Sequence, residues 1–505
     1  MQSAYLSSLF PPLPSPPRYL LHGLPFLMSL PAGKSEVNGP EPTGWWDRPC
    51  GGRDVMRLAV PLIVSMSALT VMQFVDRMFL LWHSKESMAA AMPAGMVQFM
   101  LVCFPMGVAS YVSTFVAQYR GAGHAERIGP AVWQGARVGL FCTPLFLAMV
   151  PLAPWIFWLA GHKPELAALE TLYFQVCMFG AGGFVIASAM SAFFTGLGKT
   201  RVVMVVDSSS SLLNVVLDYG WIFGHFGLPA LGIEGAGWAT VASLWFRVAV
   251  YAVLMMTPRY RRPYCLWSGR SFNAPLMKRL FQFGGPNGLQ LLVEIGGFTL
   301  FLLLVGTLGE DAMAATTLAF NINLLAFMPM LGLGIALSTI VGQQLGGNRP
   351  TLAARATWTS LWMAMTYMGT MALVYVAIPD VLMMGHAAGA SPEEFAKLRA
   401  TTVVLLRFVA AYCLFDALNL VFVSALKGAG DMRFIMLVSL AITPFPLLAA
   451  WAGMRFAGGG LIWCWVIATL WVSSVGLLYC ARFLHGQWRN MRVIEPELLV
   501  VETGK

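Results

Sequence analysis

Three carboxylates lie in the middle of long apolar segments of the chain. Asp76 lies in TVMQFVDRMFLLW, Glu294 in LQLLVEIGGFTLFL and Asp416 in VAAYCLFDALNLVFV. A fourth segment, SSLLNVVLDYGWIFG, adds the polar pair Asn214 and Asp218. A carboxylate inside hydrocarbon is costly and usually serves an ion or a substrate. These residues are therefore candidates for binding a cation.

The spacing of the polar residues strengthens this interpretation. Tyr412 and Asp416 are four residues apart, and so are Asn214 and Asp218, so each pair shares one face of a helix. A small cation that sheds its water needs oxygen atoms from several side chains. The candidate residues are Glu294, Tyr412 and Asp416 in the second half of the chain and Asp76, Asn214 and Asp218 in the first half.

Other interpretations of these acids remain open. A protonated carboxyl group can form an inert hydrogen bond between helices inside a membrane. Asp76 is followed by Arg77, which offers it an ionic partner. Asp207 lies nearer the end of its apolar segment, where a solvent-exposed helix cap competes with a functional role.

Composition indicates which elements position these residues. Of 505 residues, 58% are hydrophobic and only 11% are charged, with a mean hydropathy of +0.69. Soluble domains are about one quarter charged, and each membrane-spanning helix takes about 20 apolar residues. The sequence thus predicts an all-α integral membrane protein. It argues against a soluble enzyme, a nucleic-acid-binding module and a disordered scaffold.

Alternation of apolar stretches with short polar turns predicts twelve spanning helices. The predicted spans are 55–82, 89–119, 131–159, 166–194, 202–224, 233–257, 278–306, 312–345, 352–378, 400–426, 433–453 and 458–483.

The spans group into two lobes of six helices. We predict a first lobe at 53–258, a cytoplasmic linker at 259–277 and a second lobe at 278–484. Residues 1–52, rich in Pro and Gly, are expected to form a disordered cytoplasmic extension, and 485–505 a cytoplasmic tail.

The distribution of basic residues predicts the orientation. Loops after even-numbered spans carry fourteen Lys and Arg residues, against five on the other side. Short cytoplasmic loops of membrane proteins are enriched in these residues. We therefore expect a multi-pass protein of the cell (inner) membrane with both termini in the cytoplasm.

An internal repeat relates the two lobes. A shift of 225 residues superposes STFVAQYRG (113–121) on STIVGQQLG (338–346), and a shift of 232 superposes GLGKTRVVM (196–204) on GAGDMRFIM (428–436). Six spans return the chain to the side where it started, so the copies are expected to be parallel and related by an axis along the membrane normal. A cavity between two pseudo-symmetric lobes follows from this arrangement.

Motifs of enzymes and cofactor sites are not apparent in the sequence. The stretch GLGKT resembles a phosphate-binding loop, but Phe193 stands where that pattern requires Gly. The eight cysteines show no paired spacing, and we find neither a nucleophile elbow nor a metalloprotease motif. We expect a protein that is not an enzyme, holds no cofactor and acts as a monomer.

The chain resembles the multidrug and toxic compound extrusion (MATE) family over roughly residues 53–484. The resemblance rests on several stretches of the sequence: VDRMFLLW, MAAAMPAG, FVAQYRGAG, FFTGLGKTR, LLNVVLDYGWIFGHFGLPALGIEGAGWATV, IVGQQLGGN and ALKGAGDMR. It implies a twelve-helix antiporter that exports organic cations and other amphipathic compounds by alternating access, driven by sodium or protons.

The resemblance also implies roles for individual residues. The NorM-type branch has a cation site in its second lobe. Its residues resemble Glu294, Tyr412 and Asp416, where sodium is the candidate ion. The family's first-helix aspartate corresponds to Asp76. The pair used by proton-coupled and archaeal-type members resembles Asn214 and Asp218. Because both sets are present, the coupling ion stays open between Na⁺ and H⁺.

A lipid-linked oligosaccharide flippase is the alternative transporter. Such a protein needs several basic residues in its cavity to hold pyrophosphate. Intramembrane arginine candidates are few, which favours the drug exporter: Arg77, Arg137, Arg247 and Arg407.

Overall fold

The computed structural model describes residues 44–159, 161, 163–387 and 392–495. The chain divides into a unit Met1–Gly44 and a unit Trp45–Lys505, and all described helices belong to the second unit. Most of the predicted N-terminal extension and residues 496–505 of the predicted tail lie outside the described ranges. Over those ranges the elements are α-helices and short 3₁₀ turns, with no strand.

The first lobe contains eight helical segments. They are α1 (Gly52–His83), α2 (Lys85–Ser110), α3 (Val112–Gly121), α4 (Ile128–Met149), α5 (Ala153–Leu159), α6 (Pro164–Gly196), α7 (Thr200–Phe223) and α8 (Ile233–Met256).

A short helix in the linker and eight segments of the second lobe follow. They are α9 (Pro258–Arg261), α10 (Ala274–Gly306), α11 (Glu310–Gly346), α12 (Pro350–Ala377), α13 (Pro379–Ala387), α14 (Pro392–Ala429), α15 (Met432–Ile442), α16 (Pro444–Phe456) and α17 (Leu461–His485).

The predicted membrane fold is confirmed, with one change in its third span. Within the described residues, 11 helices are long and apolar enough to cross a membrane, and one bent pair brings the number to 12. The bent pair lies in the predicted span 131–159, where the helix breaks and α5 turns away by 65°. Pro151 lies at the break. Because proline has no N–H and clashes with the preceding turn, it interrupts the helix there.

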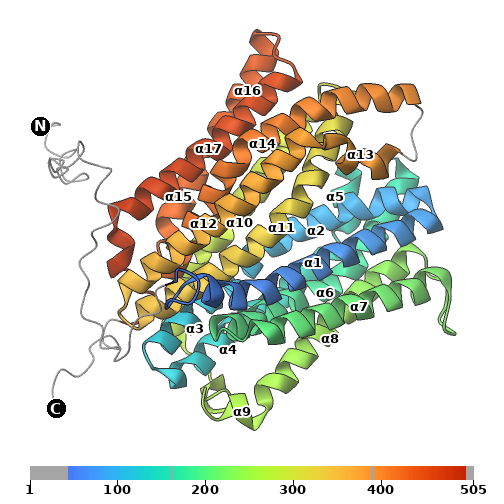
Figure 1. Ribbon diagram of the computed structural model, residues 1–505. Coiled ribbons are helices and arrows are strands. Elements are labelled where there is room, and N and C mark those ends of the chain that lie inside the picture. The colour runs from blue at the N-terminus through green and yellow to red at the C-terminus, as the bar shows by residue number, and fades with distance from the viewer. Residues whose placement is uncertain (1–43, 160, 162, 388–391, 496–505) are drawn as a thin grey trace, which may run out of the picture. The chain divides into compact units, whose positions relative to one another are not determined.

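Helix packing repeats from one lobe to the other (Figure 1). In the first lobe the fourth spanning helix, α6, packs against α2, α4 and α8. In the second lobe the fourth spanning helix, α14, packs against α11, α12 and α17. Each lobe is thus assembled around the same member of the repeat, which agrees with the duplicated sequence.

The two lobes meet through equivalent helix pairs, α2 with α10 and α1 with α11. A Cβ added at Gly107 would lie 2.5 Å from Cα of Gly288, and one at Gly332 would lie 2.8 Å from the backbone N of Ile63. The shift of 225 residues converts the first pair into the second. Glycine permits this close backbone approach because it has no Cβ.

Candidate functional site

The polar residues predicted in the first lobe lie on neighbouring helices. Asp76 lies on α1, and Asn214 and Asp218 lie on α7, which packs along α1. Asn214 and Asp218 are buried, with exposed fractions of 1% and 0%. The two carboxylates are close enough to interact electrostatically. The structure therefore brings the whole first-lobe set together.

Hydrogen bonds engage one oxygen atom of Asp218 and leave its other oxygen, and one oxygen of Asp76, without a donor in the described part of the chain. With the Asn214 amide oriented so that both of its polar atoms have partners, its nitrogen donates to Asp218 Oδ2 at 3.1 Å and its oxygen accepts from the Thr240 backbone N–H at 3.3 Å. Asp76 Oδ1 and Asp218 Oδ1 are shut off from solvent, and neither accepts a hydrogen bond from any described residue. Buried carboxylate oxygens without a donor are costly. A bound cation or proton would offset that cost.

Two residues of α6 that the sequence analysis did not identify face the same site. Tyr173 and Cys177 both interact electrostatically with Asp76 and Asp218. They are buried, with exposed fractions of 8% and 1%. Their spacing of four residues places them on one face of α6, and the same spacing rule would have identified them in the sequence.

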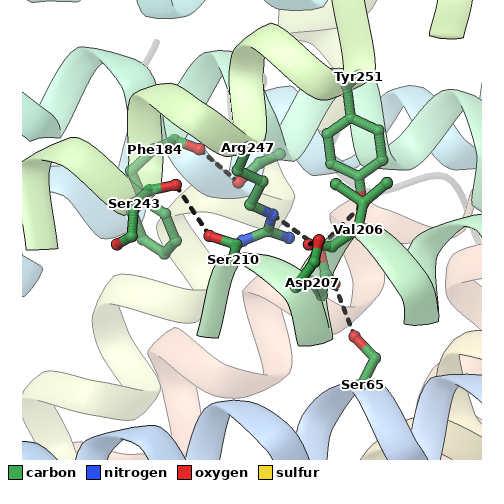
Figure 2. A network of polar contacts seen from close by, with 10 residues as sticks. Ser65, Phe184, Val206, Asp207, Ser210, Ser243, Arg247 and Tyr251 are labelled. Carbon is green, nitrogen blue, oxygen red and sulfur yellow. Dashed lines mark hydrogen bonds and ion pairs between the residues drawn. The ribbon is translucent and has the colours of Figure 1, made fainter. Parts of the chain in front are cut away.

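Asp207 does not cap a helix, so the cap interpretation is wrong. It lies within α7, is 1% exposed and forms an ion pair with Arg247 of α8, with 2.7 Å between Oδ1 and Nε. The Tyr251 hydroxyl donates to Oδ1 at 2.9 Å, and the Ser65 hydroxyl donates to Oδ2 at 2.6 Å. Figure 2 shows these side chains converging on Asp207. The network joins α1, α7 and α8, and Ser65 attaches the helix that carries Asp76.

Breaking this ion pair is expected to destabilise the protein strongly. Arg247→Leu leaves the Asp207 carboxylate buried without its counter-charge, which costs about 3–5 kcal/mol in unfolding free energy. Ser65→Ala removes one hydrogen bond and should cost about 1–2 kcal/mol. Thermal unfolding of the purified variants in detergent measures both effects.

The double variant Asp207→Leu with Arg247→Leu provides the control. Removal of both charges should recover most of the stability lost in Arg247→Leu. Equal melting temperatures for Arg247→Leu and the wild-type protein would contradict the buried ion pair.

Tyr412 and Asp416 lie on α14, the helix around which the second lobe is assembled. Asn323 of α11 donates to the Tyr412 hydroxyl at 3.4 Å, and the Tyr375 hydroxyl of α12 donates to Asn323 Oδ1 at 3.4 Å. Asp416 is half-buried one turn along the same helix and interacts with Tyr412 electrostatically. Tyr412 and Asp416 thus form a local pair, and Asn323 and Tyr375 join it.

Glu294, on another helix, interacts with other side chains. It is an exposed residue of α10, and its Oε1 accepts a hydrogen bond from Gln290 Nε2 at 2.7 Å. Its electrostatic neighbours are Lys427 and Tyr479. Among the described residues, no hydrogen bond or ion pair joins Glu294 to Tyr412 or Asp416. A sodium site formed by all three therefore stays a prediction.

One open pocket of the described structure is lined by none of the predicted residues. It has a volume of about 580 Å³ and lies between α10, α11 and α14. Glu310, Thr317 and Asn321 provide its polar lining.

The fold and these sites define a class: a membrane transporter of two related six-helix lobes with buried carboxylates. A family model described as MatE matches residues 61–220 and 286–451. The chain belongs to the MatE family, as its resemblance to the multidrug and toxic compound extrusion transporters indicated.

Two curated bacterial proteins are similar to this chain. The multidrug resistance protein PmpM of Pseudomonas aeruginosa is 29% identical over 399 residues, which cover 77% of this chain and 80% of PmpM. The probable multidrug resistance protein NorM of Burkholderia pseudomallei is 28% identical over 440 residues, covering 85% and 92%.

Solved structures share the fold. A multidrug resistance MATE family transporter of the MOP superfamily, described in an outward-facing conformation, superposes with a TM-score of 0.79. It is 18% identical, and the match covers 90% of this chain and all of that one. The eukaryotic MATE transporter AtDTX14 superposes with a TM-score of 0.75 at 20% identity, covering 87% and 96%.

Proposed function

We propose that this protein exports organic cations and other amphipathic compounds in exchange for Na⁺ or H⁺. The observation that carries the proposal is the pair Asp76 and Asp218, whose buried Oδ1 atoms have no donor among the described residues. Acids buried at mid-membrane are retained where an ion or a proton visits them. The names of the two relatives, both multidrug resistance proteins, support a role in drug export.

The position of α1 suggests how the cation couples to transport. It carries Asp76 and packs against α7 within its own lobe and against α11 of the other lobe. A cation between Asp76 and Asp218 would draw α1 toward α7, and α1 would then pack differently on α11. One binding event would in this way favour one arrangement of the lobes, as alternating access requires.

Export then follows from competition between cation and substrate. If the transport states that bind the coupling cation cannot also hold the cationic substrate, cation influx from outside releases the substrate there. Asp416, Tyr412 and Glu294 are proposed to serve cation or substrate binding in the second lobe. The basic loops support an inner-membrane location with both termini in the cytoplasm.

The flippase alternative finds less support among the arginine side chains. Arg247 is committed to Asp207. Arg137 donates to the backbone carbonyl oxygens of Arg270 and Ser271 in the linker. Of the four intramembrane arginine candidates, two are thus engaged with partners in the protein and are not available for a pyrophosphate group.

Efflux from vesicles tests the proposal and identifies the coupling ion. The purified protein is reconstituted into vesicles that are loaded with a fluorescent organic cation. Sodium and proton gradients are then imposed separately. We expect one gradient to accelerate efflux and the other to leave it at the passive rate of protein-free vesicles. Passive efflux under both gradients would contradict an antiporter.

A further inference from the structure

We propose that residues 486–495, which follow α17, form a strap that holds the two lobes together at one end of the bundle. We call this end the basic end, and it is defined by the connections 122–127, 197–199, 257–273, 347–349 and 430–431. The inference uses the proposed function only in requiring that the lobes part at this end. The strap occurs once in the chain. It adds to contacts between the lobes that occur twice, once from each half of the repeat, and we call these contacts the duplicated closure.

The duplicated closure consists of two equivalent hydrogen bonds between the lobes. Gln118 of α3 donates to the Gly428 carbonyl oxygen at 3.0 Å. Gln343 of α11 donates to the Gly196 carbonyl oxygen at 2.8 Å. The repeat shifts relate Gln118 to Gln343 and Gly196 to Gly428. The two contacts are therefore one interaction made twice, once in each direction across the interface.

Close backbone contact accompanies these hydrogen bonds. A Cβ added at Gly121 would lie 1.9 Å from the Gln343 carbonyl oxygen, and one at Gly346 would lie 2.1 Å from the Gln118 carbonyl oxygen. Gly121 and Gly346 are also related by the shift of 225. The backbones at the ends of α3 and α11 thus lie in direct contact.

The strap adds contacts to only one side of this closure. The Val493 backbone N–H donates to Gln118 Oε1 at 2.8 Å, and the Tyr119 hydroxyl donates to Glu495 Oε2 at 2.9 Å. Gln118 and Tyr119 belong to the first lobe, whereas the strap extends from the last helix of the second lobe. Both contacts therefore cross between the lobes. Gln118 consequently uses its amide nitrogen for the closure and its oxygen for the strap.

The strap is anchored firmly to the second lobe. Arg279 of α10 donates to the carbonyl oxygens of Val493 and Ile494, both at 2.5 Å. Trp488 is 1% exposed and stacks on Phe483 with 4.6 Å between ring centroids. Val493 and Ile494 are also buried. Burial of these apolar side chains favours the docked strap, because removing apolar surface from water is favourable.

The asymmetry of the strap identifies its effect. Among the described residues, the strap forms no hydrogen bond with Gln343 or Gly196, the second copy of the closure. When the lobes part at the basic end, Gln118 and Tyr119 must release the strap or pull it from its anchor. The strap therefore biases the protein toward the state that is closed at this end.

Hydrogen–deuterium exchange of the full-length protein tests this inference without any transport assay. The double variant Tyr119→Phe with Glu495→Gln removes a hydrogen bond between strap and first lobe while preserving shape. The matched control, Tyr264→Phe with Glu126→Gln, makes the same two residue exchanges at the same end of the bundle. A second variant, truncated after Asn490, removes the whole interlobe contact of the strap.

The informative segment is 194–201, which carries the Gly196 carbonyl group. Because no hydrogen bond among the described residues joins the strap to this segment, faster exchange there indicates that the lobes have parted. We expect exchange there to rise about threefold in the double variant and tenfold or more in the truncation, relative to the control. Faster exchange confined to 115–121, with 194–201 unchanged in both variants, would overturn the inference and leave the strap a passive cover.

Discussion

Asp218→Asn is expected to reduce gradient-driven efflux by about a hundredfold while leaving the protein folded. Asparagine preserves the shape of the side chain and can still bond to Asn214, but it removes the charge that faces Asp76. Hydrogen bonds to charged groups contribute about 1.5–3 kcal/mol, which corresponds to roughly ten- to a hundredfold in binding. Loss of one of the two carboxylates proposed to hold the cation places the effect at the upper limit. Efflux from reconstituted vesicles with the coupling gradient imposed measures it.

Asp311→Asn is the matched control for this prediction. Asp311 forms an ion pair with Lys397 at 2.5 Å, and both side chains are exposed. Such surface pairs contribute about 0–1 kcal/mol to stability, so efflux should be unchanged. Wild-type efflux in a well-expressed Asp218→Asn protein would contradict the first-lobe site.

The same substitution in the second lobe separates the two candidate sites. Asp416→Asn should abolish cation-driven efflux if the pair formed with Tyr412 takes part in coupling. It should leave efflux unchanged if that pair takes no part. If Asp416→Asn loses efflux and Asp218→Asn keeps it, the coupling site lies in the second lobe. The geometry favours the first lobe, because Asp76, Asn214 and Asp218 interact there, whereas no hydrogen bond or ion pair among the described residues joins Glu294 to Asp416.

Gly121→Ala is expected to prevent closure of the basic end and to reduce efflux by about thirtyfold. The new methyl group would overlap the Gln343 carbonyl oxygen, which lies 1.9 Å from the Cβ position. Overpacking of this kind costs about 1–3 kcal/mol, and 2 kcal/mol corresponds to roughly thirtyfold. Alanine favours helix over glycine by about 1 kcal/mol, so a loss of efflux cannot come from a weaker helix. Gly346→Ala should behave in the same way.

Gly285→Ala is the control for this prediction. Gly285 lies within α10, and a Cβ there would have no heavy atom within 4 Å. Efflux by Gly285→Ala should match that of the wild-type protein. Hydrogen–deuterium exchange at 338–346 should be slow in Gly285→Ala but fast in Gly121→Ala. Slow exchange and normal efflux in Gly121→Ala would show that the ends of α3 and α11 can accommodate the added methyl group.

Much of the fold could be predicted because the membrane acts on each segment separately. A helix of about 20 apolar residues satisfies its own backbone inside the bilayer, so hydropathy indicates the spans without knowledge of their neighbours. The repeat was visible because both copies preserve Gln118 and Gln343 with their surrounding residues. The bend at Pro151 was the exception, since an apolar composition continues through the break.

The sequence alone thus determined the twelve spans, the duplication and the polar residues that share one helix face at a spacing of four, such as Asn214 and Asp218. Only the tertiary structure decided which helices meet. It paired Asp207 with Arg247, bonded Gln290 to Glu294 and docked the strap on Gln118. The physical reason is that hydropathy and helical spacing act over a few turns of one helix, whereas ion pairs and interlobe hydrogen bonds join residues up to 376 positions apart.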